Sequence, residues 1–142
     1  MSKTEIIGPV AELNQTAENV FAAFSDVSNF TKNLPEDKRD QVIATPDTLT
    51  IMAQGMQLGI RVVERIPYKE IRFEQYGATP LFPFTLWIRL EDLEGGRSSL
   101  QLEFHAELNM LLKMMLEPKL KDGIIKITEQ IAAGINQQQA NS

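Results

Sequence analysis

The stretch that decides the fold is Asn109–Gln137, NMLLKMMLEPKLKDGIIKITEQIAAGINQ. Its apolar residues recur at intervals of three and four, which is the spacing of side chains that share one face of an α-helix. At about 100° per residue they form a stripe roughly 100° wide, with most of the charged residues on the opposite side. The stripe consists of Leu116, Leu120, Ile124, Ile127, Ile131 and Ile135. We therefore predict one long amphipathic helix that buries one face.

Three residues of this helix are unusual. Gly123 and Gly134 lie beside the apolar stripe, where bulky side chains are normally found. They either permit close packing on a sheet or leave space between the sheet and the helix. Pro118 removes one backbone hydrogen bond. It predicts either a kink in the helix or a break that makes Met110–Glu117 a separate segment.

The middle of the chain, from Gln41 to Leu108, alternates between apolar and polar residues with a period of two. This pattern is typical of strands with one buried face and one solvated face. Turn signals at Pro46-Asp47, Pro67–Lys69 and Glu94–Arg97 separate successive strands. The sequence therefore predicts six consecutive antiparallel strands, over 41–45, 48–54, 56–66, 71–76, 84–91 and 100–108.

The N-terminal part supplies one more strand and two short helices. Residues 4–13 read as a strand that Pro9 restricts to a sheet edge or a bulge. Thr16 can cap a helix that follows it, with a break near Ser25, and a second short helix is predicted between Val27 and Leu34. The order of elements is β-α-α-β6-α, an α+β fold in which the last helix covers one face of a seven-stranded antiparallel sheet.

Length and composition limit the number of domains, the partners and the metal sites that the protein can have. The 142 residues predict a single domain over 1–142, with 137–142 as a frayed tail. A net charge of −5 without a basic cluster argues against nucleic acid and anionic membranes as partners. With no cysteine and one histidine, thiolate and His-rich metal sites are excluded, and we expect no metal and no cofactor.

No targeting signal is evident in the sequence. No apolar run approaches the roughly 20 residues that span a bilayer, and Met1–Glu5 lacks the apolar core of a signal peptide. We therefore expect a cytoplasmic protein without membrane insertion.

The order of elements and one N-terminal stretch resemble the START-like, or helix-grip (SRPBCC), superfamily, in particular its polyketide cyclase/dehydrase-like branch. The stretch is Thr16–Phe30, TAENVFAAFSDVSNF. Members typically show Ser or Thr, acidic residues, Val-Phe or Val-Trp, and an Asp-hydrophobic turn into a second helix. Here Ala17 stands where proline is common and Phe30 where tryptophan is frequent. The resemblance covers about Glu5 to Gln137 and includes Gly95-Gly96 before the last strand.

The resemblance implies a curved seven-stranded antiparallel sheet wrapped around the C-terminal helix, with an apolar cavity between them. Members of the superfamily bind lipids, sterols, polyketides or quinones, act as cyclases, or serve as co-chaperones. Fold membership alone does not select among these functions.

One set of residues would line such a cavity, because strand alternation and the helical stripe point them toward each other. From the strands they are Met56, Leu58, Ile60, Phe73, Phe84, Leu86 and Phe104, and from the helix Met115, Leu116, Leu120 and Ile124. The same residues could equally form a filled core. Methionines favour the pocket, since their flexible side chains adapt to varied apolar ligands.

Two polar residues, Glu64 and Gln75, share the inward parity. A carboxylate or an amide in an apolar cavity could bind or activate a ligand. The alternative is that a bulge, or a position near the strand end, returns Glu64 to water. An enzyme of the cyclase/dehydratase kind would require at least one of the two to be buried and paired.

The outward parity carries the remaining candidates. His105 lies between two glutamates, and we expect a solvated histidine beside Trp87 or Arg89, because no serine or aspartate completes a triad. Trp87 itself indicates either a partner surface or an indole shielded by arginine stems. We conclude that the chain binds a small hydrophobic ligand and is not an enzyme. An enzyme, a protein-binding adaptor and a homodimer remain as alternatives.

Overall fold

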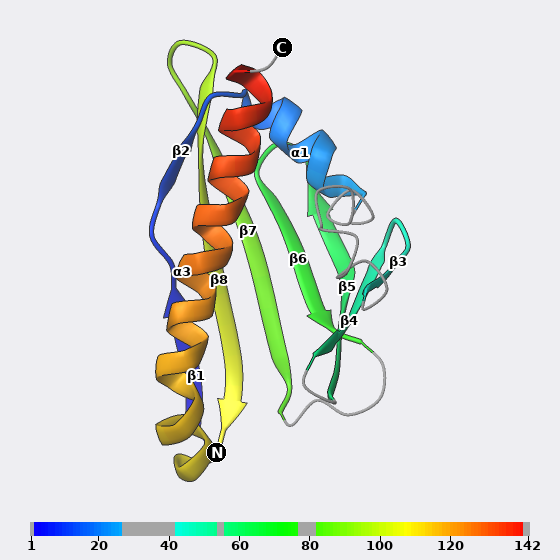
Figure 1. Cartoon of the computed structure of the whole chain (residues 1–142), viewed down its shortest axis with the longest axis vertical. Helices are drawn as coiled ribbons and strands as arrows, with labels where there is room; N and C mark the ends of the chain where they lie inside the picture. The colour runs from blue at the N-terminus through cyan, green and yellow to red at the C-terminus, as the bar shows by residue number, and fades with distance from the viewer. Residues whose placement is uncertain (1, 27–41, 54–55, 77–81, 141–142) are drawn as a thin grey trace.

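One curved antiparallel sheet and two helices form the described part of the molecule (Figure 1). The computed structural model describes residues 2–26, 42–53, 56–76 and 82–140. The elements are β1 (Ser2–Ile7), β2 (Ala11–Leu13), α1 (Ala17–Ser25), β3 (Val42–Ala44), β4 (Thr48–Ala53), β5 (Met56–Ile66), β6 (Glu70–Gln75), β7 (Phe84–Leu93), β8 (Arg97–Leu108) and α3 (Met110–Ala140). The predicted α+β architecture is confirmed. The second short helix that was predicted lies outside the described residues.

The strand order in the sheet is β1-β8-β7-β6-β5-β4-β3, and β2 also pairs with β8. The strand predicted over 4–13 is therefore one edge strand, interrupted at Pro9, whose two halves both lie on β8. Proline lacks the N–H that would continue the ladder. Gly8 makes the last bond before the interruption, since its N–H donates to the Leu102 carbonyl at 2.9 Å.

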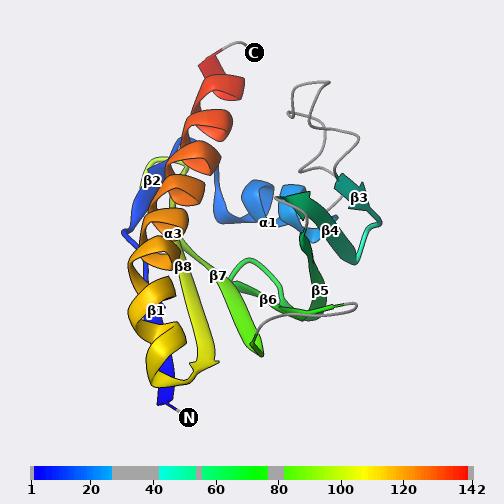
Figure 2. The same ribbon diagram turned by 60° about the horizontal axis from the view of Figure 1, so that its bottom comes forward.

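The inner face of the sheet is built from cross-strand rows of apolar side chains. One row runs through Ile6, Phe104, Leu86, Phe73 and Val62, which are register partners on β1, β8, β7, β6 and β5. Successive side chains of a strand point to opposite faces, so the alternation seen in the sequence produces this face directly. The two helices pack on the inner face (Figure 2).

Helix α1 covers the part of this face that belongs to β6 and β7. The Thr16 hydroxyl accepts the Asn19 N–H at 3.2 Å, which confirms the predicted cap. Asp92 at the end of β7 accepts the Ala17 N–H at 2.9 Å and so fixes the start of the helix to the sheet. Val20 and Phe24 are buried in the core, as their spacing predicts.

Helix α3 is continuous from Met110 to Ala140 and contains Pro118. The prediction of a separate segment before the proline is therefore wrong. The Asn109 side chain accepts the Leu112 N–H at 2.9 Å and caps the first turn, which satisfies one donor of the helix start. The helix also continues three residues beyond the predicted end at Gln137.

Helix α3 packs against β8, β2 and β1 rather than against all strands. Ile124 is buried at this contact, but Ile127 is 45% exposed, so its predicted place in the buried stripe is wrong. Thr128 is buried instead, and its hydroxyl donates to the Ile124 carbonyl at 2.8 Å. A hydroxyl that is satisfied within its own helix can enter the core, and this makes a buried threonine hard to recognise from hydrophobicity alone.

Candidate functional site

The two long sides of α3 have different surroundings. On one side, Ile124 and Thr128 lie against Gly8, where a Cβ atom would come 2.7 Å from Ile124 Cγ2. On the same side, the Asn136 side chain accepts the Asn14 N–H at 2.9 Å, at the end of β2. This side of α3 is therefore fixed to the edge strand.

The other side of α3 faces along the sheet toward β7, β6 and β5. At about 100° per residue, Gly123, Ile127 and Gly134 lie 60 to 100° from Ile124 in the direction away from Thr128, roughly on one line along the helix. Apart from the neighbouring residues and backbone of the helix itself, no atom of the described residues lies within 4 Å of the position that a Cβ would take at Gly123 or Gly134. Together with the exposed Ile127, this makes the side of α3 turned away from the edge strand apolar and open.

The inner face of the sheet presents apolar groups opposite this open side. Ile60, Val62 and Leu86 are only partly buried, and they belong to strands that α3 does not cover. At the start of β7, Phe84 stacks on Phe104 with ring centroids 5.3 Å apart, and Phe82 meets Phe84 edge-on at 6.2 Å. We call the half-buried aliphatic residues and these three rings the inner apolar surface.

Most of the predicted lining residues lie on this face. Register places Ile60, Phe73, Phe84, Leu86 and Phe104 there. Leu116 and Leu120 of α3 are half-buried, and Ile124 is buried against the edge strand. The backbones of Met56 and Leu58 pair with Ala53 and Ile51, and their side chains lie outside the described residues.

Met115 does not lie on the inner side of α3. On the helical wheel it lies on the opposite side of the helix from Ile124, and the residue is 57% exposed. Met110, Leu111 and Met114 are also exposed, whereas Lys113 is half-buried. Leu112 is half-buried and packs against the core, so the buried side of α3 reaches its first turn without these methionines, and the expected inward position of Met115 is wrong.

A β-bulge reverses the predicted orientations of Glu64 and Arg65. Val62 pairs with Phe73, but Glu64 pairs with Arg72 and Arg65 with Ile71, so the register shifts between Val62 and Glu64. One extra residue on the bulged strand moves every later side chain to the other face. Glu64 is therefore exposed on the outer face, which confirms the alternative of a bulge that returns it to water, and its inward position as a ligand-binding residue is wrong.

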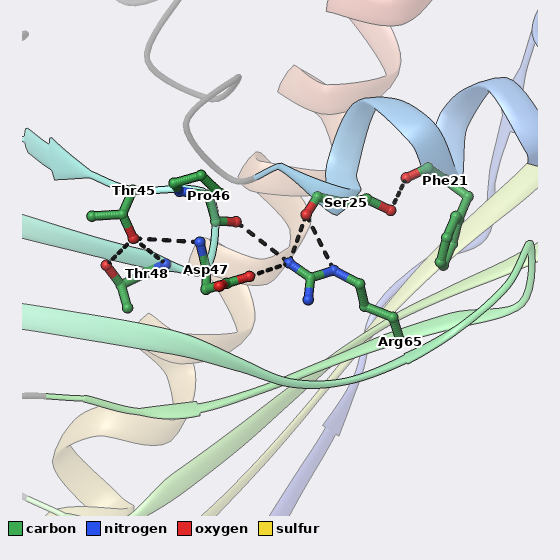
Figure 3. A network of polar contacts seen from close by, with 7 residues as sticks. All are labelled: Phe21, Ser25, Thr45, Pro46, Asp47, Thr48 and Arg65. Carbon is green, nitrogen blue, oxygen red and sulfur yellow. Dashed lines mark hydrogen bonds and ion pairs between the residues drawn. The ribbon is translucent and has the colours of Figure 1, made fainter.

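Arg65 takes the inward place instead and binds two elements at the rim of the sheet (Figure 3). Its guanidinium donates to the Ser25 carbonyl at the end of α1, at 2.7 and 3.2 Å, and to Asp47 Oδ1 in the β3–β4 turn, at 2.6 Å. It thereby satisfies a free carbonyl at the helix C-terminus. Sequence reasoning missed this role because the bulge leaves no clear signal in the alternation.

We expect Arg65→Lys to weaken this link almost as much as Arg65→Ala. A lysine presents a single point charge and cannot bond two acceptors with the fixed fork of a guanidinium. Because Asp47 is largely exposed, the loss should be about 1 kcal/mol, measured as the free energy of unfolding in urea. A full rescue by lysine would show that only the charge matters.

Gln75 is the polar residue that stays on the inner face. It is the register partner of Ile60, and the residue is partly buried. Its Oε1 atom is buried and has no hydrogen-bond partner. An unsatisfied buried acceptor is uncommon in folded proteins and requires an explanation.

The outer face of the sheet carries a charged network around Trp87. Glu103 accepts from both His105 and Arg89, and Arg89 also bonds Glu70 at 3.1 Å. The indole of Trp87 lies 4.5 Å from the His105 ring and 5.3 Å from the Arg89 guanidinium carbon. The predicted neighbours of His105 are thus confirmed, but its side chain is only 16% exposed rather than solvated. Burial alone would lower the pKa of Arg89, yet the bond to Glu70 and the charge of Glu103 outweigh burial and raise it.

Two surface hollows border this outer face. One, of about 620 Å³, is lined by Thr85, Trp87 and His105, and it reaches Gln75 and Phe84 at the ends of their strands. The other, of about 770 Å³, lies around the β5–β6 turn and the middle of β7. The Arg89 guanidinium and the His105 ring lie against Trp87, which also borders the first hollow.

Within the described ranges, no group of three or more His, Cys, Asp or Glu side chains is arranged to hold a metal ion. Among the helices described, none is long and apolar enough to cross a membrane.

The curved sheet, the long C-terminal helix and the apolar surface between them define the class: the chain has the helix-grip fold of START-like proteins. No protein-family model matches the sequence, and no curated protein matches it either. The likeness is therefore one of structure. It confirms the predicted superfamily fold and does not test the polyketide cyclase/dehydrase-like branch.

Three solved structures illustrate the likeness. Norcoclaurine synthase from Thalictrum flavum has a TM-score of 0.74 at 11% identity, over 99% of this chain and 88% of that one. The Aha1 dimer from Colwellia psychrerythraea has a TM-score of 0.65 at 14% identity, and the match covers 94% of this chain and 96% of that one. A START superfamily protein from Mycobacterium smegmatis has a TM-score of 0.54 at 13% identity, and the match covers 91% of this chain and 98% of that one. At these identities the comparison establishes the fold and not the activity.

Proposed function

We propose that the protein binds a small apolar ligand between the open side of α3 and the inner apolar surface of the sheet. The observation that carries the proposal is the empty space at Gly123 and Gly134, on a helix that packs only on the edge strand and β8. Glycine in a helix interior costs about 1 kcal/mol relative to alanine. Two such glycines beside open space indicate that room, rather than close packing, is what the helix provides.

The proposed lining consists of Ile60, Phe73, Phe84, Leu86, Phe104, Leu116 and Leu120, whereas Ile124 is buried against the edge strand and lies outside it. A pocket with mostly apolar walls and one polar group is typical of small-molecule sites. Structures of this fold include norcoclaurine synthase in complex with dopamine and hydroxybenzaldehyde, which supports a small-molecule site in a fold of this kind.

The alternative of an enzyme has less support. It would require Glu64 or Gln75 to be buried and paired; Glu64 is exposed on the outer face, and the buried Gln75 Oε1 has no partner among the described residues. The alternative of an adaptor would use Trp87, whose indole lies between His105 and Arg89. Neither arrangement favours the alternative over a ligand-binding protein.

Two substitutions at one glycine test the proposal. Gly123→Ala should raise the free energy of unfolding by roughly 0.5 to 1 kcal/mol and leave binding intact, because a methyl group meets no atom there. Gly123→Phe should place a ring in the proposed site and abolish binding. The measurements are urea unfolding and displacement of a fluorescent apolar dye, followed by native mass spectrometry.

Gly123→Ala is the matched control for Gly123→Phe, since both remove the same glycine. Two results would contradict the proposal. One is dye binding by Gly123→Phe equal to that of the parent chain, and the other is the absence of any bound or displaced ligand across lipids, quinones and polyphenols.

A further inference from the structure

The buried amide of Gln75 lies in a defined row of the inner face. Ile60 is its register partner on β5. On the other side, Glu74 pairs with Thr85, so continuing this antiparallel register by one residue places Gln75 opposite Phe84. Phe84 in turn stacks on Phe104. An amide is thus set between an aliphatic side chain and an aromatic cluster.

Among the residues that the structure describes, none donates a hydrogen bond to this amide oxygen. Oε1 is buried and unpartnered, although leaving a buried acceptor unsatisfied costs free energy. Leucine at this position would avoid the penalty and extend the apolar row. A group that the fold does not use, and that makes folding less favourable, has the character of a binding group.

At the ends of β6 and β7 the row borders a surface hollow that lies mainly over Thr85, Trp87 and His105 of the outer face. The hollow of about 620 Å³ is bordered by both Gln75 and Phe84. The terminal torsion of a glutamine is broad, so the amide can rotate its oxygen toward a bound molecule without moving the strand.

We infer that Gln75 recognises a hydroxyl group on an aromatic ring, so that the ligand of the proposed site is an uncharged phenol. An amide oxygen accepts a hydrogen bond and therefore selects a donor, whereas an ionised carboxylate offers only acceptors. The stacked rings of Phe84 and Phe104 lie beside it and are each 8% exposed, and ring–ring contacts add to simple burial. The inference rests on the proposed function, because it names the ligand class of the same site.

The test compares 2-naphthol with 2-methoxynaphthalene, in which a methyl group replaces the hydroxyl hydrogen and so removes the donor, by displacement of the fluorescent dye. The parent chain should bind 2-naphthol about five- to tenfold more tightly. Gln75→Leu should remove the difference by weakening only 2-naphthol, and its Tm should be unchanged or higher because an unsatisfied acceptor is lost. Glu64→Gln, on the outer face of the adjacent strand, is the control and should keep the full preference.

The outcomes separate the two proposals. If both naphthalenes bind the parent chain equally, or if Gln75→Leu keeps the preference for 2-naphthol, the inference is overturned and the proposed function stands. The same holds if fatty acids displace the dye and neither naphthalene does. If no compound of any class binds, the proposed function itself fails and the inference falls with it.

Discussion

Replacing Gly59 with alanine should lower the free energy of unfolding by about 3 kcal/mol, a large share of the stability of a single domain. A Cβ atom at this position would lie 2.3 Å from the Tyr76 carbonyl oxygen and 3.2 Å from its carbonyl carbon. Both atoms are backbone, so no side-chain rotation relieves the contact. The Tyr76 N–H donates to the Gly59 carbonyl at 2.9 Å, and moving Tyr76 would break this bond as well.

Urea unfolding of Gly59→Ala measures the effect, and Gly123→Ala is the matched control. Both substitutions replace a glycine by alanine, but the second meets no atom and should stabilise the helix. The two variants should therefore shift the unfolding midpoint in opposite directions. A midpoint for Gly59→Ala equal to that of the parent chain would show that the end of β6 moves aside at no cost.

The effect should also reach the proposed site. Gln75 immediately precedes Tyr76, so a displaced Tyr76 backbone changes the position of the Gln75 amide. At a low temperature at which the Gly59→Ala variant remains folded, we expect its preference for 2-naphthol over 2-methoxynaphthalene to fall below twofold.

Regular alternation made most of the sheet predictable from the sequence. The strand predicted over Met56–Ile66 coincides with β5, and the turn at Pro46-Asp47 joins β3 to β4 as expected. Each of these features depends on a local pattern of apolar residues or on turn chemistry, which neighbouring residues encode.

The alternation of apolar residues does not locate the bulge on β5, although a bulge that returns Glu64 to water was one of the two alternatives that the sequence left open. Val62, Val63 and Ile66 tolerate either face of the sheet, so nothing local marks the extra residue. The exchange of Glu64 and Arg65 is decided by distant groups, because Arg65 finds its acceptors in α1 and in the β3–β4 turn. Strict alternation therefore places Glu64 on the inner face of the sheet, whereas the structure has Arg65 on that face.

The orientation of α3 was only partly predictable for a related reason. A helical stripe specifies which residues can be buried together, but the docking partner decides which edge of the stripe is covered. Contact with Gly8 covers the edge of Ile124 and Thr128 and leaves Ile127 exposed. The open side that the proposed site uses is thus a consequence of docking on the edge strand.

Gly8→Ala tests this docking and should lower the free energy of unfolding by about 2 kcal/mol. The added methyl group would lie 2.7 Å from Ile124 Cγ2 and 3.3 Å from the Leu102 carbonyl oxygen. Helix α3 must then move away from β1 and β2, or Ile124 must leave its preferred rotamer. Hydrogen exchange of the amides in the middle of α3 should become faster, while that of β6 and β7 should not change.

A double-mutant cycle with Ile124→Ala separates the steric contact from other effects of the substitution. Ile124→Ala alone removes Cγ2 and leaves a cavity, which should cost about 2 to 4 kcal/mol. In the double variant the new methyl group occupies part of that cavity, so the total loss should be smaller than the sum of the two by at least 1 kcal/mol. Additive losses would mean that residue 8 must be glycine because of its backbone conformation, and not because α3 approaches it closely. The coupling would instead show that the closeness of α3 to the edge strand, and with it the open space at Gly123, is set by the absence of a side chain at residue 8.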